Sequence, residues 1–154
     1  MNSAPTGADR PGTGDAVVPV RDFHWRAIRW GFGVSAMLTL IFGVPLMIGS
    51  DSIWWLAWVA VGGLFVGGVL AARIARTSEP LNGAMIALLF FGVVAVGYLV
   101  GQAVEILPDP LPGLAPDNST FFFVWPLTQI TAGPFGSYVG GRVWRLAARE
   151  EASG

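Results

Sequence analysis

The polar side chains with the greatest chemical potential lie in the last hydrophobic stretch of the chain. Thr128, Gln129 and Thr131 stand between Pro126 and Pro134, in a segment otherwise rich in apolar residues and glycine. An amide buried in an apolar medium must find a hydrogen-bond partner or cost a few kcal/mol. These three residues are therefore a candidate polar pocket at a proline-broken helix. The alternative, which we favour, is that Gln129 links two helices while the threonines bond their own helix carbonyls.

A second polar pair, Gln102 and Glu105, closes the third hydrophobic stretch. Proton-coupled carriers place ionisable groups deep in the membrane, where such groups mark transport sites. No Asp, Glu or Lys lies inside any of the hydrophobic stretches, and the arginines that fall within their bounds, Arg29, Arg73 and Arg142, lie within three residues of an end. We therefore expect Glu105 to be a solvated charge at the membrane surface, and the absence of buried charge is evidence against such a carrier.

Metal, redox and catalytic chemistry find little support in the composition. The chain has no cysteine and a single histidine, His24, which is flanked by Phe23 and Trp25. His24 could sense pH or help to hold a cofactor, but an interfacial residue is the simpler interpretation. No serine lies near a base and no pair of carboxylates is buried, so we expect no enzymatic activity and no catalytic, cofactor or metal site. The net charge of −1 offers no basic surface for nucleic acid.

The elements that carry these residues are four hydrophobic stretches, at about 27–48, 53–74, 81–104 and 120–142. Each is close to or above the roughly 20 residues that a helix needs to cross a bilayer. The sequence predicts an all-α, polytopic membrane protein whose four helices form two hairpins within residues 23–145. Residues 1–22 are rich in Pro, Gly, Ser, Thr and Asp, which predicts a disordered cytoplasmic tail. Residues 146–154 form a second cytoplasmic tail.

The arginines fix the expected orientation. The chain has nine arginines and no lysine. Every arginine lies near or before the start of the first stretch, between the end of the second and the start of the third, or at or after the end of the fourth. The other two connections carry only acidic charges, among them Asp51 and Glu105. Because short loops rich in Lys and Arg stay in the cytoplasm, both termini should be cytoplasmic. Arginine without lysine, with abundant Ala, Gly and Pro, suggests the cytoplasmic membrane of a prokaryote.

Glycines spaced four residues apart recur in three of the stretches and predict close helix packing. A missing side chain lets two backbones approach, which replaces the hydrophobic force that is absent between helices in lipid. The sequence does not say whether such contacts form within one chain or between chains. The pairs are Gly63 and Gly67, Gly97 and Gly101, and Gly136 and Gly140.

The second and fourth stretches also have similar sequences near their ends. The segment from Phe65 to Arg76 aligns with the segment from Tyr138 to Arg149, sharing a Val-Gly-Gly core and a final Ala-Arg. This match is compatible with a parallel duplication of a hairpin, and equally with chance among common membrane residues.

At the level of Val-Gly-Gly-Val-Leu-Ala-Ala-Arg, followed by Pro-Leu-Asn-Gly-Ala, the chain resembles small four-helix, glycine-rich prokaryotic membrane proteins of unknown function. The resemblance covers about residues 28–145 and implies the four-helix architecture, with no site residues to carry over. Two other four-helix classes do not fit. Small multidrug carriers need a glutamate in the first span, which is absent here, and fluoride channels carry a polar Thr-Thr-Phe-Ser stretch where this chain has Thr120 followed by three phenylalanines.

Two functions remain open. The first is a non-enzymatic structural or accessory protein that packs in the lipid bilayer with itself, as a homo-oligomer, or with a larger membrane complex. The second is a small channel or carrier for a neutral or weakly polar solute, in which Thr128, Gln129 and Thr131 would line the path. We favour the first, and the surroundings of Gln129 are the feature that should distinguish them.

Overall fold

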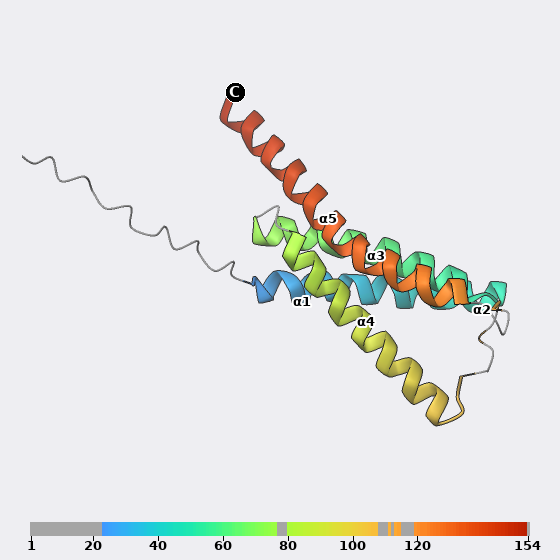
Figure 1. Ribbon diagram of the computed structural model, residues 1–154. Helices are drawn as coiled ribbons and strands as arrows, with labels where there is room; N and C mark the ends of the chain where they lie inside the picture. Colours follow the sequence, from blue (N-terminus) through green and yellow to red (C-terminus); the bar gives the residue numbers. More distant parts are fainter. Residues whose placement is uncertain (1–22, 77–79, 108–110, 112, 115–118, 154) are drawn as a thin grey trace, which may run out of the picture.

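The computed structural model describes residues 23–76, 80–107, 111, 113–114 and 119–153, with side chains up to residue 149. Every regular element in this part of the chain is helical, which confirms the all-α class. The predicted disordered tail at 1–22 lies outside the described residues. The elements, shown in Figure 1, are α1 (Trp25–Leu38), the π-helical turn η1 (Thr39–Gly43), α2 (Val44–Ser50), α3 (Ile53–Ala75), α4 (Pro80–Ala103) and α5 (Ser119–Ser153).

Three helical segments are long and apolar enough to cross a membrane. They are Trp25–Ser50, which runs through α1, η1 and α2 without a break, and the helices α3 and α4. The expected spans at 27–48, 53–74 and 81–104 thus agree with helices to within about two residues. These are the properties of an integral membrane protein.

Helix α5 differs from the other three. It is not among the segments that are apolar enough to cross a membrane, because Gln129 and the threonines, prolines and glycines in its apolar part lower its mean hydropathy. A fourth span at 120–142 therefore stays a prediction. The helix also passes straight through the region assigned to the second tail and continues to Ser153, and neither Pro126 nor Pro134 ends it. The broken helix on which the pocket interpretation relied is therefore not present, since α5 is continuous through both prolines.

The ends of the helices have recognisable local causes. Asp51 adopts a left-handed conformation (φ 50°) between α2 and α3, which reverses the chain within two residues. Pro80 is the first residue of α4, where its missing N–H costs nothing. Arg76 ends α3, again in the left-handed region with φ 52°. Asp51, Arg76 and Pro80 thus mark the places where helices end or begin, and successive helices run antiparallel.

The helices pack as two pairs, α1 with α3 and α4 with α5, and the contact between α3 and α5 joins the two pairs. Helix α5 makes its most extensive contact with α3, while α1 packs against α3 and α4 packs against α5. The two hairpins expected from the sequence are present in this sense. Figure 1 shows that α1 and α3 run alongside each other, whereas α4 diverges from them toward its C-terminal end.

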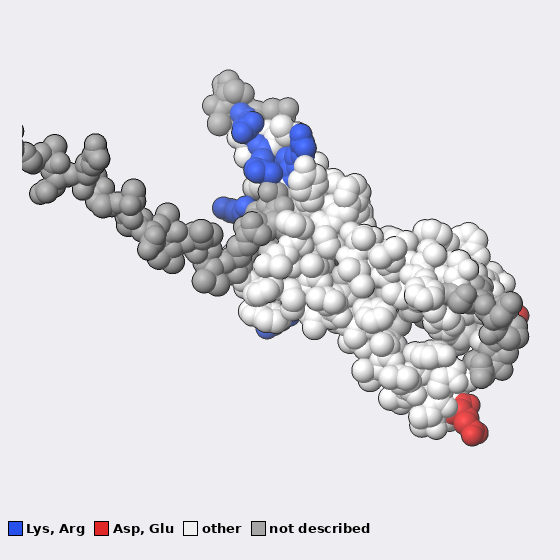
Figure 2. Space-filling model, viewed as in Figure 1, with Lys and Arg blue, Asp and Glu red and all other residues white. Residues whose placement is uncertain are grey.

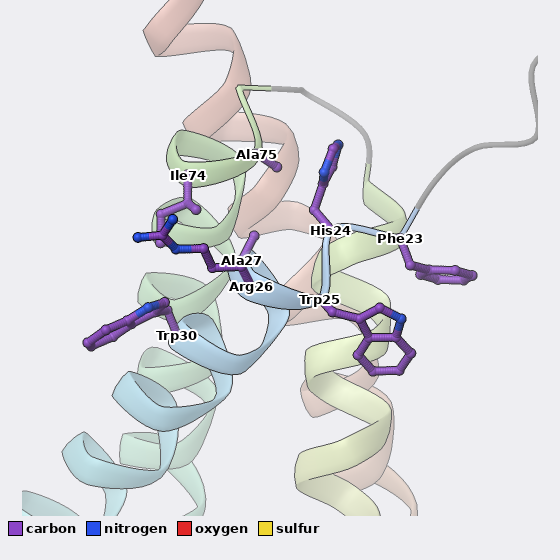
Figure 3. Close-up of a pocket in the computed structure, with 8 residues that line it drawn as sticks. All are labelled: Phe23, His24, Trp25, Arg26, Ala27, Trp30, Ile74 and Ala75. Atoms are coloured by element: carbon purple, nitrogen blue, oxygen red, sulfur yellow. The ribbon is translucent and has the colours of Figure 1, made fainter.

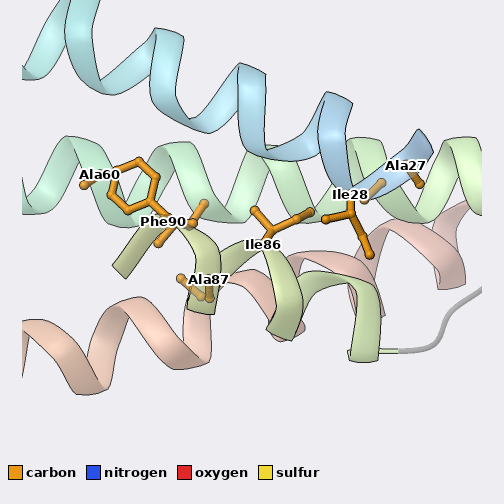
Figure 4. Close-up of a cluster of buried hydrophobic side chains, with 9 residues drawn as sticks. Ala27, Ile28, Ala60, Ile86, Ala87 and Phe90 are labelled. Carbon is orange, nitrogen blue, oxygen red and sulfur yellow. The ribbon is translucent and has the colours of Figure 1, made fainter. Parts of the chain in front are cut away.

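The core is built mainly from small residues, with a few larger side chains filling the gaps. Ile28, Leu64 and Ile86 are fully buried and come from α1, α3 and α4. Alanines at 27, 60, 71 and 87 join them in one cluster, which is drawn in Figure 4. Small residues at these positions allow the helix axes to come close.

Charge divides the described residues into two ends. Arg26, Arg29, Arg73, Arg76, Arg142, Arg145 and Arg149 belong to the helix ends on one side, whereas Asp51 and Glu105 lie in connections on the other. Figure 2 shows blue side chains gathered at one end of the elongated molecule and red ones at the opposite end. We refer below to the arginine end and the acidic end.

Candidate functional site

Gln129 is the most unusual polar residue in the described part of the chain. Its side chain is 0% exposed, and neither its amide nitrogen nor its amide oxygen has a hydrogen-bond partner there. It lies three residues before Ala132, which belongs to the main apolar cluster. The predicted hydrogen bond from Gln129 to another span is therefore not formed, and the buried amide carries an uncompensated desolvation cost.

The two threonines beside it point elsewhere. The Thr128 hydroxyl donates to the Val124 and Trp125 carbonyls at 3.0 and 2.8 Å, and the Thr131 hydroxyl donates to the Leu127 carbonyl at 3.0 Å. Both threonines thus bond their own helix, as the alternative interpretation held. Thr131 is exposed and Thr128 half-buried. The structure does not bring the three residues together into one pocket, because successive helical positions are rotated by about 100°.

A cavity of about 430 Å³ opens nearer the acidic end, where α4 leaves the bundle. We call it the α4–α5 cleft. Its walls come from four helices and the connection before α5. The lining residues are Met47 of α2; Ile53, Leu56 and Ala57 of α3; Phe91, Val94, Ala95 and Tyr98 of α4; Leu107 and Leu111 of the connection; and Phe121, Phe122, Trp125 and Pro126 of α5.

The cleft follows one stripe of α4 and one stripe of α5, and each stripe leads to an unpartnered amide. On α4, the lining positions 91, 94, 95 and 98 share a face whose next member, one turn on, is Gln102. On α5, positions 122, 125 and 126 share a face with Gln129, one turn deeper. Among the described residues, the side-chain nitrogens of Gln102, Trp125 and Gln129 are buried without an acceptor.

The second feature of the site is a set of glycine contacts on the side of α3 and α5 nearer the arginine end. A Cβ on Gly68 of α3 or on Gly83 of α4 would meet the Gly133 carbonyl oxygen of α5. Gly133 in turn faces the Gly83 carbonyl. Three helices therefore touch backbone to backbone at one point. None of these three glycines belongs to the pairs singled out in the sequence.

Four of the predicted packing glycines also lie at helix crossings. Gly63 and Gly67 face the Ser35 turn of α1, and a Cβ on Gly63 would stand 3.0 Å from the Ser35 carbonyl oxygen. Gly136 and Gly140 of α5 face the backbone of α3 at Phe65 and Val69. The contacts in this chain are thus between neighbouring helices of the same molecule.

The third predicted pair behaves differently. Gly97 has no atom within 4 Å of the position that a Cβ would occupy. Gly101 is covered by the Leu107 side chain of its own connection rather than by another helix. Within the chain, Gly97 and Gly101 do not mark a helix crossing, because this half of α4 has already diverged from the bundle.

Buried hydroxyls add hydrogen bonds between helices at the glycine crossings. Ser35 of α1 is fully buried and donates to the Gly63 carbonyl of α3 at 3.0 Å, and Ser137 of α5 donates to the Gly68 carbonyl at 3.1 Å. Such bonds in lipid are modest in strength, typically about 0.6–2 kcal/mol. These hydrogen bonds form where a glycine lets two helices come close. Close packing and hydrogen bonding therefore stabilise the same helix crossings.

The arginine end has a shallower hollow of about 730 Å³ between the start of α1 and the end of α3. Figure 3 shows Arg26 and Trp30 on one side of it and His24 on the other, with the rings of Phe23 and Trp25 turned outward. His24 is exposed, and its backbone N–H contacts the Asn82 Oδ1 at 3.4 Å. Among the described residues, no group of three His, Cys, Asp or Glu side chains could hold a metal ion.

Glu105 lies where the sequence expects it, just after α4 and exposed to the surroundings. It adopts a left-handed conformation with φ 56°, and its backbone N–H donates to the Gln102 carbonyl at 3.1 Å. No described ionisable side chain is buried in the bundle. The interpretation of Glu105 as an interfacial charge is consistent with this position.

Comparison with protein-family models, with curated proteins and with solved structures gives no match to this chain.

Sequence reasoning missed the α4–α5 cleft and the role of Trp125 in it. The aromatic residues at 121–125 suggest an interfacial belt, and nothing local indicates that Phe121 and Trp125 stack with ring centroids 5.2 Å apart beneath the connection. The sequence of the connection before α5 did indicate that the connection packs against the helices. Leu107, Leu111 and Leu114 are regularly spaced apolar residues in a proline-rich loop, and Leu111 and Leu114 are 9% exposed.

Proposed function

We propose that this chain is a non-enzymatic integral membrane protein that serves a structural or accessory role, packing with itself or within a larger membrane complex. In this proposal it spans the cytoplasmic membrane of a prokaryote four times, with both termini in the cytoplasm. The proposal takes α5 as the fourth span, since it lies along α3 for much of its length. The separation of the arginine end from the acidic end supports the orientation.

The observation that carries the functional proposal is the exposed half of α4. Val93, Val96, Leu99 and Val100 are all more than half exposed, and Gly97 among them leaves a notch with nothing within 4 Å. Inside the chain, the same glycine spacing is used for close backbone contact. A notch of this kind on a lipid-facing helix suits the approach of a second helix, because a neighbouring backbone can come nearer there than at any branched residue.

The test is a substitution that alters this notch and nothing inside the bundle. Gly97→Leu should leave the folded chain as stable as the wild type, because no atom of the described residues lies within 4 Å of the position that its Cβ would occupy. It should lower the fraction of protein that migrates as an oligomer or complex on native electrophoresis in mild detergent. Val93→Leu, which keeps a branched side chain one turn away on the same face, is the matched control.

Two results would contradict the proposal. One is a wild-type protein that stays monomeric and partner-free in mild detergent when isolated from its own membrane. The other is a Gly97→Leu variant whose complex is as abundant as that of the wild type and of Val93→Leu.

A second candidate function is favoured by the unpartnered amide of Gln129. A small channel or carrier for a neutral or weakly polar solute would have a use for a buried amide with free donor and acceptor groups. Against it, the backbone contact of Gly68, Gly83 and Gly133 closes the bundle one turn below Gln129 toward the arginine end. A solute that stabilises the wild type, and no longer stabilises Gln129→Leu, would favour this candidate over the structural role.

A further inference from the structure

Helix α5 leaves the bundle well before it ends. Gly140 is still in contact with α3, since a Cβ there would stand 2.8 Å from the Val69 Cα. Every residue from Arg142 to Arg149 is exposed, although the helix continues to Ser153. Figure 1 shows this end of α5 extending past the ends of α1 and α3. The side chains of this segment therefore face the surroundings rather than the bundle.

Four hydrogen-bond donors form one stripe along this end of α5. They lie at positions i, i+4, i+7 and i+11, a spacing that repeats on one face of a helix. Gly136 and Gly140, which face α3, each precede a member of the stripe by two residues, a rotation of about 200°. The stripe is therefore on the side of α5 turned away from α3. Its members, which we call the arginine stripe, are Tyr138, Arg142, Arg145 and Arg149.

The arginine stripe carries positive charge that no neighbouring described side chain balances. Arg142 Nη1 donates to the Tyr138 hydroxyl at 3.0 Å, which uses one of the five N–H donors of the guanidinium. Among the side chains that the structure describes, Arg145 and Arg149 have no hydrogen-bond or ion-pair partner. The glutamates at 150 and 151 follow in the sequence but fall outside the spacing of the stripe. Like charges three or four residues apart on a helix repel each other, and an anion between neighbouring arginines removes that repulsion.

The arginine stripe lies at the level of the lipid headgroups. Arg142 marks the end of the expected span at 120–142, and Arg149 follows about 10.5 Å further along the helix axis. Headgroup layers add roughly 5–8 Å on each side of a hydrocarbon core of about 30 Å. Figure 1 shows α5 crossing α3 obliquely, so α5 rises toward the membrane surface by less than its length. The apolar helices α1 and α3 bring Arg29 and Arg73 to the same end.

We propose that the arginine stripe binds the phosphate group of anionic lipids in the leaflet at the arginine end. Phosphate oxygens accept hydrogen bonds from the planar guanidinium groups, a geometry that suits arginine better than lysine. The bond to Tyr138 holds the Arg142 guanidinium against the helix, and its remaining N–H groups bind the phosphate. The proposal rests on the crossing of α5 proposed above, but not on the choice between a structural role and a carrier.

Exposed apolar residues beside the stripe favour a lipid over a dissolved anion or an acidic protein. Val143 and Leu146 are 60% and 54% exposed, and Trp144 is 37% exposed. Apolar groups alternating with arginines suit the boundary between acyl chains and headgroups, where cationic side chains extend to the phosphates and tryptophan is enriched. A dissolved anion would leave these apolar groups in water. The cytoplasmic leaflet also carries anionic lipids that attract basic segments next to a span.

The experiment measures lipid retention by native mass spectrometry of the full chain in mild detergent with equal amounts of phosphatidylglycerol and phosphatidylcholine. Both lipids have a phosphate, but choline balances its charge in phosphatidylcholine, so the comparison isolates the net charge of the headgroup. The wild type should retain phosphatidylglycerol in preference. Arg145→Gln and Arg149→Gln should each reduce that preference roughly fivefold, which corresponds to about 1 kcal/mol for one cationic side chain near an anionic surface. Glutamine is a good helix former, so α5 should stay folded.

Arg73→Gln is the matched control. It removes the same charge from the same end, but Arg73 belongs to α3, which packs against the opposite face of α5. This variant should leave the preference for phosphatidylglycerol unchanged, and thermal unfolding checks that all three variants are folded. A reporter at residue 154 tests the crossing of α5, and complex formation by Gly97→Leu tests the structural role. A failure of either is therefore distinguishable from a failure of lipid binding.

Four outcomes would overturn the proposal. The first two are equal retention of both lipids by the wild type and an unchanged preference in Arg145→Gln and Arg149→Gln. The third is a loss in Arg73→Gln as large as in the stripe variants, which would make the net charge of the arginine end the cause. The fourth is displacement of phosphatidylglycerol by millimolar inorganic phosphate, which would identify a dissolved anion as the ligand.

Discussion

At the scale of single residues, Gln129 and Ser137 show that two buried polar groups on one helix face can differ in hydrogen bonding. Both side chains are fully buried on α5, eight residues apart. Ser137 meets a carbonyl that a glycine on α3 leaves open, whereas Gln129 meets no partner in the described residues. Burial alone therefore says little about what a polar residue contributes. Whether another helix supplies a hydrogen-bond partner decides whether the buried polar group stabilises or destabilises the folded chain.

This contrast predicts opposite effects for two substitutions on α5. Gln129→Leu should leave the free energy of unfolding unchanged or raise it by up to about 1–3 kcal/mol, because it removes an unsatisfied amide and keeps the volume. Ser137→Ala should lower it by about 0.6–1.5 kcal/mol, because it removes a formed hydrogen bond. Reversible unfolding in mixed detergent measures both. A loss of stability for Gln129→Leu equal to that for Ser137→Ala would show that the amide has a partner after all.

At the scale of the elements, glycine position rather than glycine content determines the helix contacts. Helix α3 carries Gly62 and Gly67 about one and a half turns apart on different faces. A Cβ on Gly67 would meet the Ser35 hydroxyl and the Gly31 carbonyl of α1, whereas a Cβ on Gly62 would meet nothing within 4 Å. The same residue type is thus a close contact in one position and a lipid-facing site in the other.

The matched pair Gly67→Ala and Gly62→Ala tests this point. We expect Gly67→Ala to lower the unfolding free energy by about 1–3 kcal/mol, since a methyl group must push two backbones apart. Gly62→Ala should be neutral or stabilising by up to about 1 kcal/mol, because alanine is the better helix former and space is available. Thermal melting of the two variants beside the wild type is sufficient. Similar melting temperatures for the pair would refute the packing role of Gly67.

At the scale of the whole molecule, the charged ends and the helix order together predict how the chain is oriented. The described arginines gather at one end, and Asp51 and Glu105 lie at the other, with three apolar helices between them. Crossing an uncharged slab three times would place the start of α1 and the connection before α5 on opposite sides. A fourth crossing by α5 would return the chain to the arginine end, where Arg142, Arg145 and Arg149 lie.

Reporter fusions test that orientation. A reporter at residue 154 and one at the N-terminus should both report the cytoplasm, while a reporter inserted within residues 108–116 should report the opposite side. A reporter at residue 154 that reads the same side as the 108–116 insertion would show that α5 does not cross. It would leave the other three helices in place.

Much of the architecture follows from the sequence because its causes are local. A run of some 20 apolar residues forms a helix in lipid whatever its neighbours are, since every backbone group must bond within the segment. The starts of α3 and α4 likewise follow from the short connection expected at 49–52, of which residues 51 and 52 lie outside the helices, and from Pro80. The separation of arginines from acidic residues needs no tertiary information either. For these features, sequence and structure agree.

The site, in contrast, depends on how helices cross, and a single sequence contains no direct record of that. Gly67 and Gly97 have similar local surroundings, yet one lies under α1 and the other faces away from every helix. Gln129 has no hydrogen-bond partner among the described residues, and α4 diverges beyond the contact of Gly83 with Gly133. The same divergence opens the cleft beside Trp125. Periodicity places a residue on a helix face, but only the packing of backbone against backbone between distant segments decides what that face meets.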